Sequence, residues 1–225
     1  MIFDLDNTLV DFMKFKRQSV EAAVDAMIDA GLKIDKKKAE EIIYEIYEEK
    51  GIEYQRIFDE FLEKVLGEID YKILSAGIVA YRRVKEATLS IYPHVRQTLT
   101  ELLKMNMKLG VVSDAPRLQA WTRIAQAGLL HYFDVVVTFD DTRVLKPAAE
   151  PFMFALNKLG LEPKEAIMVG DWAERDIVGA KQIGMITVFA RYGDVFGTQN
   201  SGADYEINDI YELVDIVKNL NKKGG

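Results

Sequence analysis

Residues 166–190 of the chain read AIMVGDWAERDIVGAKQIGMITVFA, and this stretch decides the fold class. Its two ends, Ala166–Val169 and Ile186–Phe189, are short runs of apolar and β-branched residues, which are typical of buried strands. The segment between them, near Glu174–Ile183, has the pattern of a helix. A strand, a helix and a second strand in this order predict a βαβ unit, which places the two strands parallel in one sheet.

The same alternation extends toward the N-terminus. Two more β-rich runs and two more helical patterns precede this stretch, and they are Leu109–Val112, Arg117–Ala127, Val135–Thr138 and Glu150–Leu159. Gly128, Gly160 and Gly184 each follow a predicted helix, where glycine accepts the left-handed conformation that ends many helices. The sequence therefore predicts an α/β fold with a doubly wound parallel sheet.

Residues 14–87 have a different pattern, because β-rich runs are absent and apolar residues recur at spacings of three and four. Ile42, Ile43, Ile46 and Tyr47 form one such stripe. We expect four helices with breaks near Gly31, Gly51 and Gly67, and we expect Asp35 and Asp70 to cap two of them. Pro93 is expected in the first turn of a further helix that reaches about Asn106.

The predicted domains are a catalytic core, residues 1–13 and 88–225, and an all-helical insertion, residues 14–87. An insertion directly after the first strand lies at the carboxyl edge of the sheet, where ligands bind in open α/β folds. The insertion is therefore expected to act as a cap or lid over the site.

Composition excludes several classes of function. The net charge of −7, with no basic block longer than Lys36–Lys38, predicts no nucleic-acid or anionic-membrane partner. The chain has no cysteine, so disulfides and cysteine nucleophiles are excluded. No apolar run is long enough for a membrane span, and the acids Asp4 and Asp6 stand where a signal peptide would have a basic and then an apolar segment. We expect a soluble, cytoplasmic monomer or homodimer.

Polar residues gather where predicted strands end. The four clusters are Asp4-Leu5-Asp6-Asn7-Thr8, Ser113-Asp114, Lys146-Pro147, and Gly170-Asp171 with Asp176. Residues two apart in an extended segment point to the same side, so Asp4 and Asp6 share one side of the chain. Together with Asp171 they would form a carboxylate cluster that cannot stay ionised without a cation. Oxygen ligands predict Mg²⁺.

These four motifs, in this order, resemble those of the haloacid dehalogenase superfamily. The helical insertion after the first motif is similar to the cap of the phosphatase branch, and the resemblance covers nearly the whole chain. It implies an α/β core of Rossmann-like topology, Mg²⁺ as cofactor and hydrolysis of a phosphate ester through an aspartyl-phosphate.

The resemblance also implies roles for single residues. Asp4 is the expected nucleophile, because a carboxylate beside a metal can attack phosphorus and divide hydrolysis into two easier steps. Asp6 is expected to be the general acid for the leaving alkoxide and then the base for water. The carboxylates of Asp4 and Asp171, with the backbone carbonyl of Asp6, are the expected metal ligands.

The remaining motif residues are expected to bind or support the phosphate. Ser113 and Lys146 would contact its oxygens, and Lys146 would stabilise charge in the transition state. Asp114 either touches the substrate or caps the next helix. Thr8 is expected to fix the turn behind the nucleophile. Asp176 is expected either to contact the metal ligands without touching the metal or to bind the metal through water.

The expected substrate is a small phosphorylated metabolite, such as a sugar phosphate. The resemblance is closest to archaeal members that act on glyceraldehyde 3-phosphate and to acylneuraminate-9-phosphate phosphatases. A sugar-phosphate mutase with the same four motifs is an alternative. A second alternative, of a different class, is a phospho-accepting switch similar to receiver domains, which also combine clustered acids, a Ser/Thr and a Lys-Pro pair.

Overall fold

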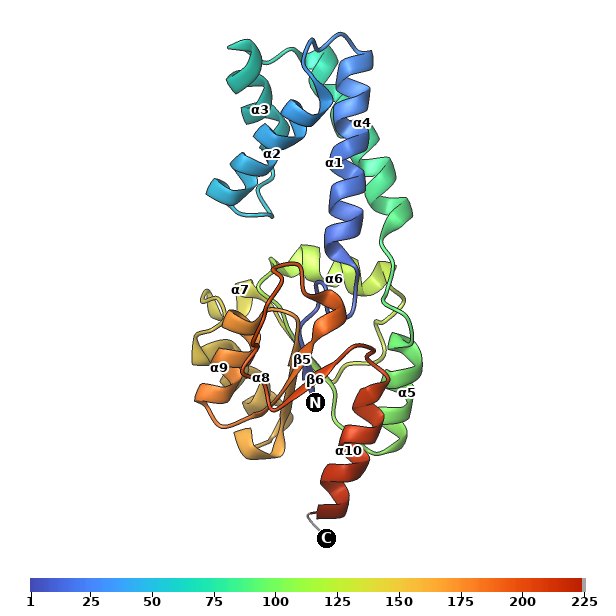
Figure 1. Ribbon diagram of the computed structural model, residues 1–225, viewed down its shortest axis with the longest axis vertical. Helices are drawn as coiled ribbons and strands as arrows, with labels where there is room; N and C mark the ends of the chain where they lie inside the picture. Colours follow the sequence, from blue (N-terminus) through green and yellow to red (C-terminus); the bar gives the residue numbers. More distant parts are fainter. Residues whose placement is uncertain (224–225) are drawn as a thin grey trace. The chain divides into compact units, whose positions relative to one another are not determined.

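The computed structural model describes residues 1–223 and divides the chain into two compact units (Figure 1). One unit combines Met1–Phe12 with the chain from Ser90 onward, and the other is Met13–Leu89. The chain leaves the first unit and returns to it within two residues of the boundaries expected from the sequence. That the inserted unit serves as a cap stays a prediction.

The first unit is built on a sheet of six parallel strands in the order β3-β2-β1-β4-β5-β6. The strands are β1 (Ile2–Phe3), β2 (Gly110–Val112), β3 (Val135–Val137), β4 (Ile167–Gly170), β5 (Ile186–Ala190) and β6 (Tyr205–Ile207). The chain builds the sheet outward from β1 to β3 and then restarts on the other side of β1 with β4. The order of the strands thus reverses beside β1, and this is the position where open α/β sheets bind ligands.

The central strand is short. β1 has two residues, both fully buried, and Ile2 pairs with Gly110 on one side and Met168 on the other. The ladder continues one step further, because the Asp4 amide donates to the Val169 carbonyl at 2.8 Å. Asp4 is therefore hydrogen-bonded to β4 and directly follows the two residues that pair with both neighbouring strands.

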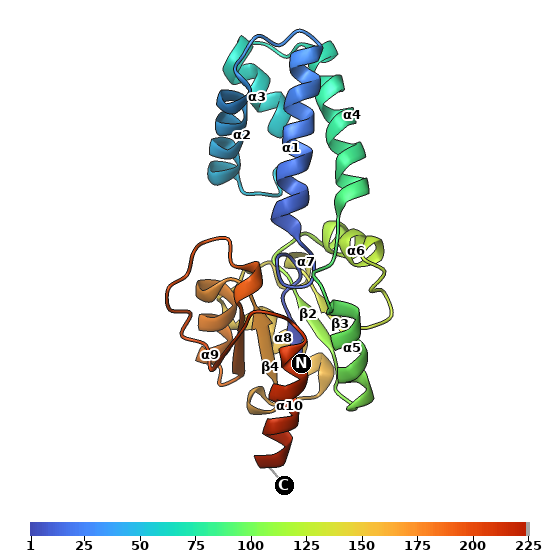
Figure 2. The same ribbon diagram turned by 45° about the vertical axis from the view of Figure 1, so that its right-hand side comes forward.

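Helices cover both faces of the sheet (Figures 1 and 2). One face carries α8 and α9, and its buried cluster joins Ile2 and Met168 of the strands to Phe152 and Leu156 of α8. The other face carries α5 and α10. The helices of this unit are α5 (Val95–Lys104), α6 (Arg117–Gln126), α7 (Phe139–Thr142), α8 (Ala149–Leu159), α9 (Val178–Gln182) and α10 (Glu212–Lys223). The predicted α/β class is confirmed.

Three details differ from the sequence analysis. The expectation that Pro93 lies in the first turn of a helix is wrong, because α5 begins only at Val95, after the N-cap residue His94, which has a left-handed conformation. The helix expected near Glu174–Ile183 is a π-helical turn, Ala173–Ile177, followed by α9. Strand β6 and the helices α7 and α10 were not predicted.

The second unit is a bundle of four helices with its own buried core. The helices are α1 (Phe12–Asp29), α2 (Lys36–Lys50), α3 (Ile57–Leu66) and α4 (Tyr71–Thr88). The side chain of Asp35 caps α2 by accepting from the Lys38 amide, and Asp70 caps α4 by accepting from the Lys72 amide. Both caps were predicted. None of the helices described in residues 1–223 has the length and apolar character needed to cross a bilayer.

Candidate active site

The first site element is the turn that follows β1. Asn7 has a φ of 58°, a left-handed conformation that asparagine tolerates better than most residues, and its amide donates to the Val10 carbonyl at 2.7 Å. Asp6 and Val10 pair as an isolated bridge. The chain therefore folds back directly after Asp4, which holds this carboxylate at the carboxyl end of the central strand.

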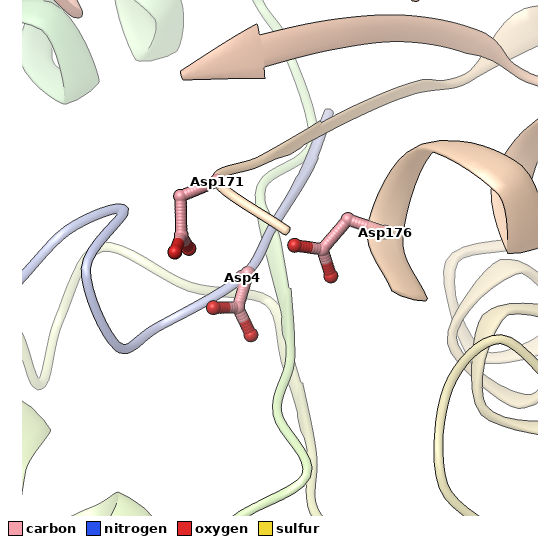
Figure 3. A group of neighbouring side chains, drawn as sticks. All are labelled: Asp4, Asp171 and Asp176. Carbon is pink, nitrogen blue, oxygen red and sulfur yellow. The ribbon is translucent and has the colours of Figure 1, made fainter. Parts of the chain in front are cut away.

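Three buried carboxylates meet at this edge of the sheet (Figure 3). One oxygen from each of Asp4, Asp171 and Asp176 lies within 4.8 Å of the other two. Asp4 follows β1 and Asp171 follows β4, so the pairing of these two strands brings the side chains together. The cluster is at the switch point of the strand order, as the sequence predicts for Asp4 and Asp171.

Asp176 enters the cluster through the π-helical turn. A Cβ atom on Gly170 would lie 2.3 Å from the Asp176 carboxyl carbon, so glycine is required for this close approach. The Trp172 amide donates to the second carboxylate oxygen of Asp176 at 3.0 Å and fixes its orientation. Asp176 is therefore a full member of the carboxylate cluster, and it lies closer to Asp4 and Asp171 than its expected supporting role would require.

Lys146 is the cation of the cluster. Its Nζ lies 2.5 Å from Asp4 Oδ1 and 2.7 Å from Asp176 Oδ1, and it donates to the Val112 carbonyl at 3.0 Å. The side chain is 3% exposed. Lys146 thus links three separate elements and lies beside Asp4, and the contact with phosphate that is expected of it stays a prediction.

Two acids of the cluster, Asp4 and Asp171, have strongly raised pKa values. Burial raises the pKa of Asp4 to about 8; Asp176 and Asp6 add repulsion, while Lys146 opposes the shift. Burial, and then the charges of Asp4 and Asp176, raise the pKa of Asp171 well above its usual range. Burial alone would lower the pKa of Lys146, but the two acids beside it outweigh burial and raise it. One lysine cannot neutralise three carboxylates, so the site favours a further positive charge.

A divalent cation fits this donor set. Asp4, Asp171 and Asp176 offer hard oxygen ligands within reach of one another, and such ligands suit small divalent ions. The Thr8 hydroxyl donates to Asp171 Oδ1 at 2.9 Å, which orients that carboxylate from behind. The sequence placed Thr8 behind the nucleophile, and the structure gives it this partner.

Ser113 and Asp114, the two residues that follow β2, have different surroundings. Ser113 is buried, and its hydroxyl accepts from the Ala115 amide at 3.2 Å. Asp114 accepts from the Lys146 amide at 2.9 Å through one oxygen and pairs with Arg175 at 2.9 Å through the other. Asp114 therefore positions the loop that carries Lys146. It makes no cap for α6, and its contact with substrate stays a prediction.

Two arginines of the site were missed in the sequence. Arg175 pairs with Asp114 and stacks on the Trp172 ring, with its Cζ 3.9 Å from the ring centroid. Arg123 on α6 lies 2.5 Å from Asp6 Oδ2 and is buried. A signal for Arg123 existed, because it lies between Ala120 and Ile124 on the face of α6 that is buried. An arginine at such a position needs an anionic partner.

A carboxylate that shares a buried site with a lysine and a divalent cation is suited to attack a centre that carries negative charge, such as the phosphorus of a phosphate ester. Fold and site together define a phosphoryl-transfer enzyme built on a doubly wound sheet. The sequence profile of haloacid dehalogenase-like hydrolases matches residues 1–190, and the chain belongs to this family.

Relatives of the chain support the same class. A glyceraldehyde 3-phosphate phosphatase of Methanocaldococcus jannaschii is 42% identical over 225 residues, which cover 99% of this chain and 98% of the relative. A protein of the same name from Methanopyrus kandleri is 35% identical over 230 residues, with 99% and 98% covered. The crystal structure of a HAD phosphatase from Thermococcus onnurineus matches with a TM-score of 0.71 and 32% identity over 96% of each chain. The predicted family and the predicted class, a phosphoric monoester hydrolase, are confirmed.

Proposed function

We propose that the protein is a Mg²⁺-dependent phosphatase that hydrolyses a small phosphate monoester through a phosphorylated Asp4. The observation that carries the proposal is the buried cluster of Asp4, Asp171 and Asp176 around Lys146 at the switch point of the sheet. This arrangement supplies a carboxylate nucleophile and a fixed positive charge at the same place.

In the first step, a carboxylate oxygen of Asp4 forms a bond to phosphorus as the bond between phosphorus and the ester oxygen breaks. Protonated Asp6 donates its proton to the departing oxygen, so the alcohol leaves as a neutral molecule. Lys146, 2.5 Å from Asp4, stabilises the negative charge on the phosphoryl oxygens during the transfer. The Ser113 hydroxyl, at the end of β2, is proposed to donate to the same oxygens.

In the second step, the Asp6 carboxylate takes a proton from a water molecule whose oxygen attacks phosphorus. The bond between phosphorus and Asp4 breaks, and inorganic phosphate and the free Asp4 carboxylate are formed. Asp6 is protonated again and ready for the next substrate. The two carboxylates thus alternate between covalent and proton-transfer chemistry.

Asp4, Asp171 and Asp176 would hold Mg²⁺ with the backbone carbonyl of Asp6, and the bound ion would supply charge stabilisation for the phosphoryl group. The raised pKa values of Asp4 and Asp171 support this assignment, because the carboxylates are costly to ionise without a cation. Thr8 keeps Asp171 oriented toward the ion through its hydrogen bond.

Glyceraldehyde 3-phosphate is the substrate that we propose. Two relatives that match this chain over 98% of their own length carry this activity in their names, and one of them is 42% identical to this chain. Membership of the family disfavours a receiver-like switch. Release of inorganic phosphate, as opposed to formation of an isomeric sugar phosphate, separates a phosphatase from a mutase.

The test is a screen of small phosphate monoesters, glyceraldehyde 3-phosphate among them, with Mg²⁺ and with a chelator. We expect release of inorganic phosphate with Mg²⁺, no turnover with the chelator, and no turnover in Asp4→Asn at either condition. Asp29→Asn is a matched control, because this acid lies at the end of α1 in the helical unit. Full activity of Asp4→Asn would contradict the mechanism.

A further inference from the structure

Arg123 is a charged residue in a place that normally excludes charge. It lies on α6, its side chain is 4% exposed, and its neighbours Ala120 and Ile124 are fully buried. Moving a guanidinium from water into such a place is costly unless a partner compensates for it. Arg123 therefore needs an anionic partner inside the protein.

That partner is the side chain of Asp6. Arg123 Nη1 lies 2.5 Å from Asp6 Oδ2, across 117 residues of chain. The Arg123 guanidinium also lies over the Phe12 ring, with Cζ 4.4 Å from the ring centroid. Hydrogen bonding at one end and the aromatic face beneath it restrict the guanidinium to one place.

The Asp6 carboxylate is separated from the other acids of the site. Asp4, Asp171 and Asp176 form the carboxylate cluster of the described residues, and Asp6 is not a member of it. Lys146 contacts Asp4 and Asp176, whereas Arg123 contacts Asp6. The nucleophile and the residue proposed to transfer protons are thus paired with different cations, Lys146 and Arg123.

We propose that Arg123 is a positioning residue that holds the Asp6 carboxyl group in the orientation needed for proton transfer to the leaving oxygen. The proposal rests on the proposed function, since it assigns a role to Asp6 in that reaction. A short aspartate side chain has few rotamers, and one fixed contact selects among them. Proton transfer requires the donor within hydrogen-bond reach of the ester oxygen, so the loss of this contact slows the step that uses it.

The experiment compares two substrates in Arg123→Gln. Glyceraldehyde 3-phosphate has an alkoxide leaving group that needs a proton, whereas 4-nitrophenyl phosphate releases a stable anion that leaves without one. The value of kcat/KM reports the reaction up to phosphoryl transfer and so isolates the first step. We expect Arg123→Gln to lower kcat/KM for the alkyl ester by about tenfold more than for the aryl ester.

Four variants accompany this measurement. Asp6→Asn should show the same preference for the aryl ester, and the double variant should be no slower than Asp6→Asn alone, because both changes remove one proton transfer. Arg117→Gln, on the same helix but exposed and paired with Asp141, should leave the ratio of the two substrates unchanged. Arg123→Lys keeps the buried charge and should recover part of the loss, and it carries the test if Arg123→Gln does not fold.

An equal loss of kcat/KM for both substrates in Arg123→Gln and Arg123→Lys would overturn the proposal, because it would indicate a structural role. The absence of any loss for either substrate would overturn it as well, and so would additive losses in the double variant. The failure of the proposed function is distinguishable, because wild-type protein would then release no phosphate from either ester.

Discussion

Replacing Lys146 with methionine should lower the free energy of unfolding of the metal-free protein by about 3–5 kcal/mol. The ammonium lies 2.5 Å from Asp4 and 2.7 Å from Asp176, and the side chain is 3% exposed. At an effective dielectric constant of about 20, each contact is worth about 6 kcal/mol before desolvation, which cancels most of the attraction. Methionine keeps the length of the side chain and removes the charge, so two buried acids lose their counterion.

The assay is denaturation by urea with a chelator and with Mg²⁺, at about pH 6 and pH 8. Burial raises the pKa of Asp4 to about 8, so its protonation at the lower pH offsets part of the loss, and Lys146→Met should cost more at the higher pH. Mg²⁺ should reduce the difference from wild type, because it supplies the missing positive charge. Turnover should still fall by about 10²–10³, since a preorganised charge beside the phosphoryl group is lost.

Lys181→Met is the matched control for this change. Lys181 pairs with Asp204 at 3.2 Å, but its side chain is 50% exposed, and an exposed pair contributes at most about 1 kcal/mol. The double variant Lys146→Met with Asp176→Asn should be more stable than Lys146→Met, because it removes a charge of each sign. Equal losses in Lys146→Met and Lys181→Met would refute the reasoning from burial.

Three further predictions follow from the same site. The pKa of Asp4 is raised from 3.8 to about 8 and that of Asp171 is also raised, so the folded state binds protons more tightly than the unfolded state. In chelator the melting temperature should therefore fall as pH rises from about 5 to 8. Mg²⁺ should remove this slope, and a flat profile in chelator would count against the raised pKa values. Gly193→Ala should cost about 1–3 kcal/mol or more in thermal denaturation, because its Cβ would lie 1.7 Å from the Asn7 carbonyl oxygen; an unchanged melting temperature would contradict this contact. Thr8→Val should weaken Mg²⁺ binding by about 10–100-fold in calorimetric titration, and an unchanged Kd would show that the hydroxyl does not orient its partner.

Local signals in the sequence determined most of the architecture. Four of the six strands were predicted within about one residue of their bounds, since short β-branched runs between helical patterns read clearly. Strand β6, three residues at the sheet edge with Glu206 exposed, has too little periodicity to be recognised. Helix α10 was within reach, because Leu213, Val214 and Val217 recur at helical spacing.

Motif order and strand ends also predicted the carboxylate site. Asp4 and Asp171 follow strands that a doubly wound sheet places side by side, so their meeting is a consequence of topology. The membership of Asp176 was not determined, because it depends on the π-helical turn and on the close approach over Gly170. A backbone detail of this kind leaves no distinct pattern in the sequence.

The sequence by itself predicted which acids would carry the chemistry, because their types and their places at strand ends are local properties. Only the tertiary structure decided which cationic side chain pairs with which acid. Lys146 lies 142 residues from Asp4, and Arg123 lies 117 residues from Asp6. Ion pairs between residues so distant in the chain depend on how helices and loops pack on the sheet, and the strength of each pair depends on burial that only packing creates.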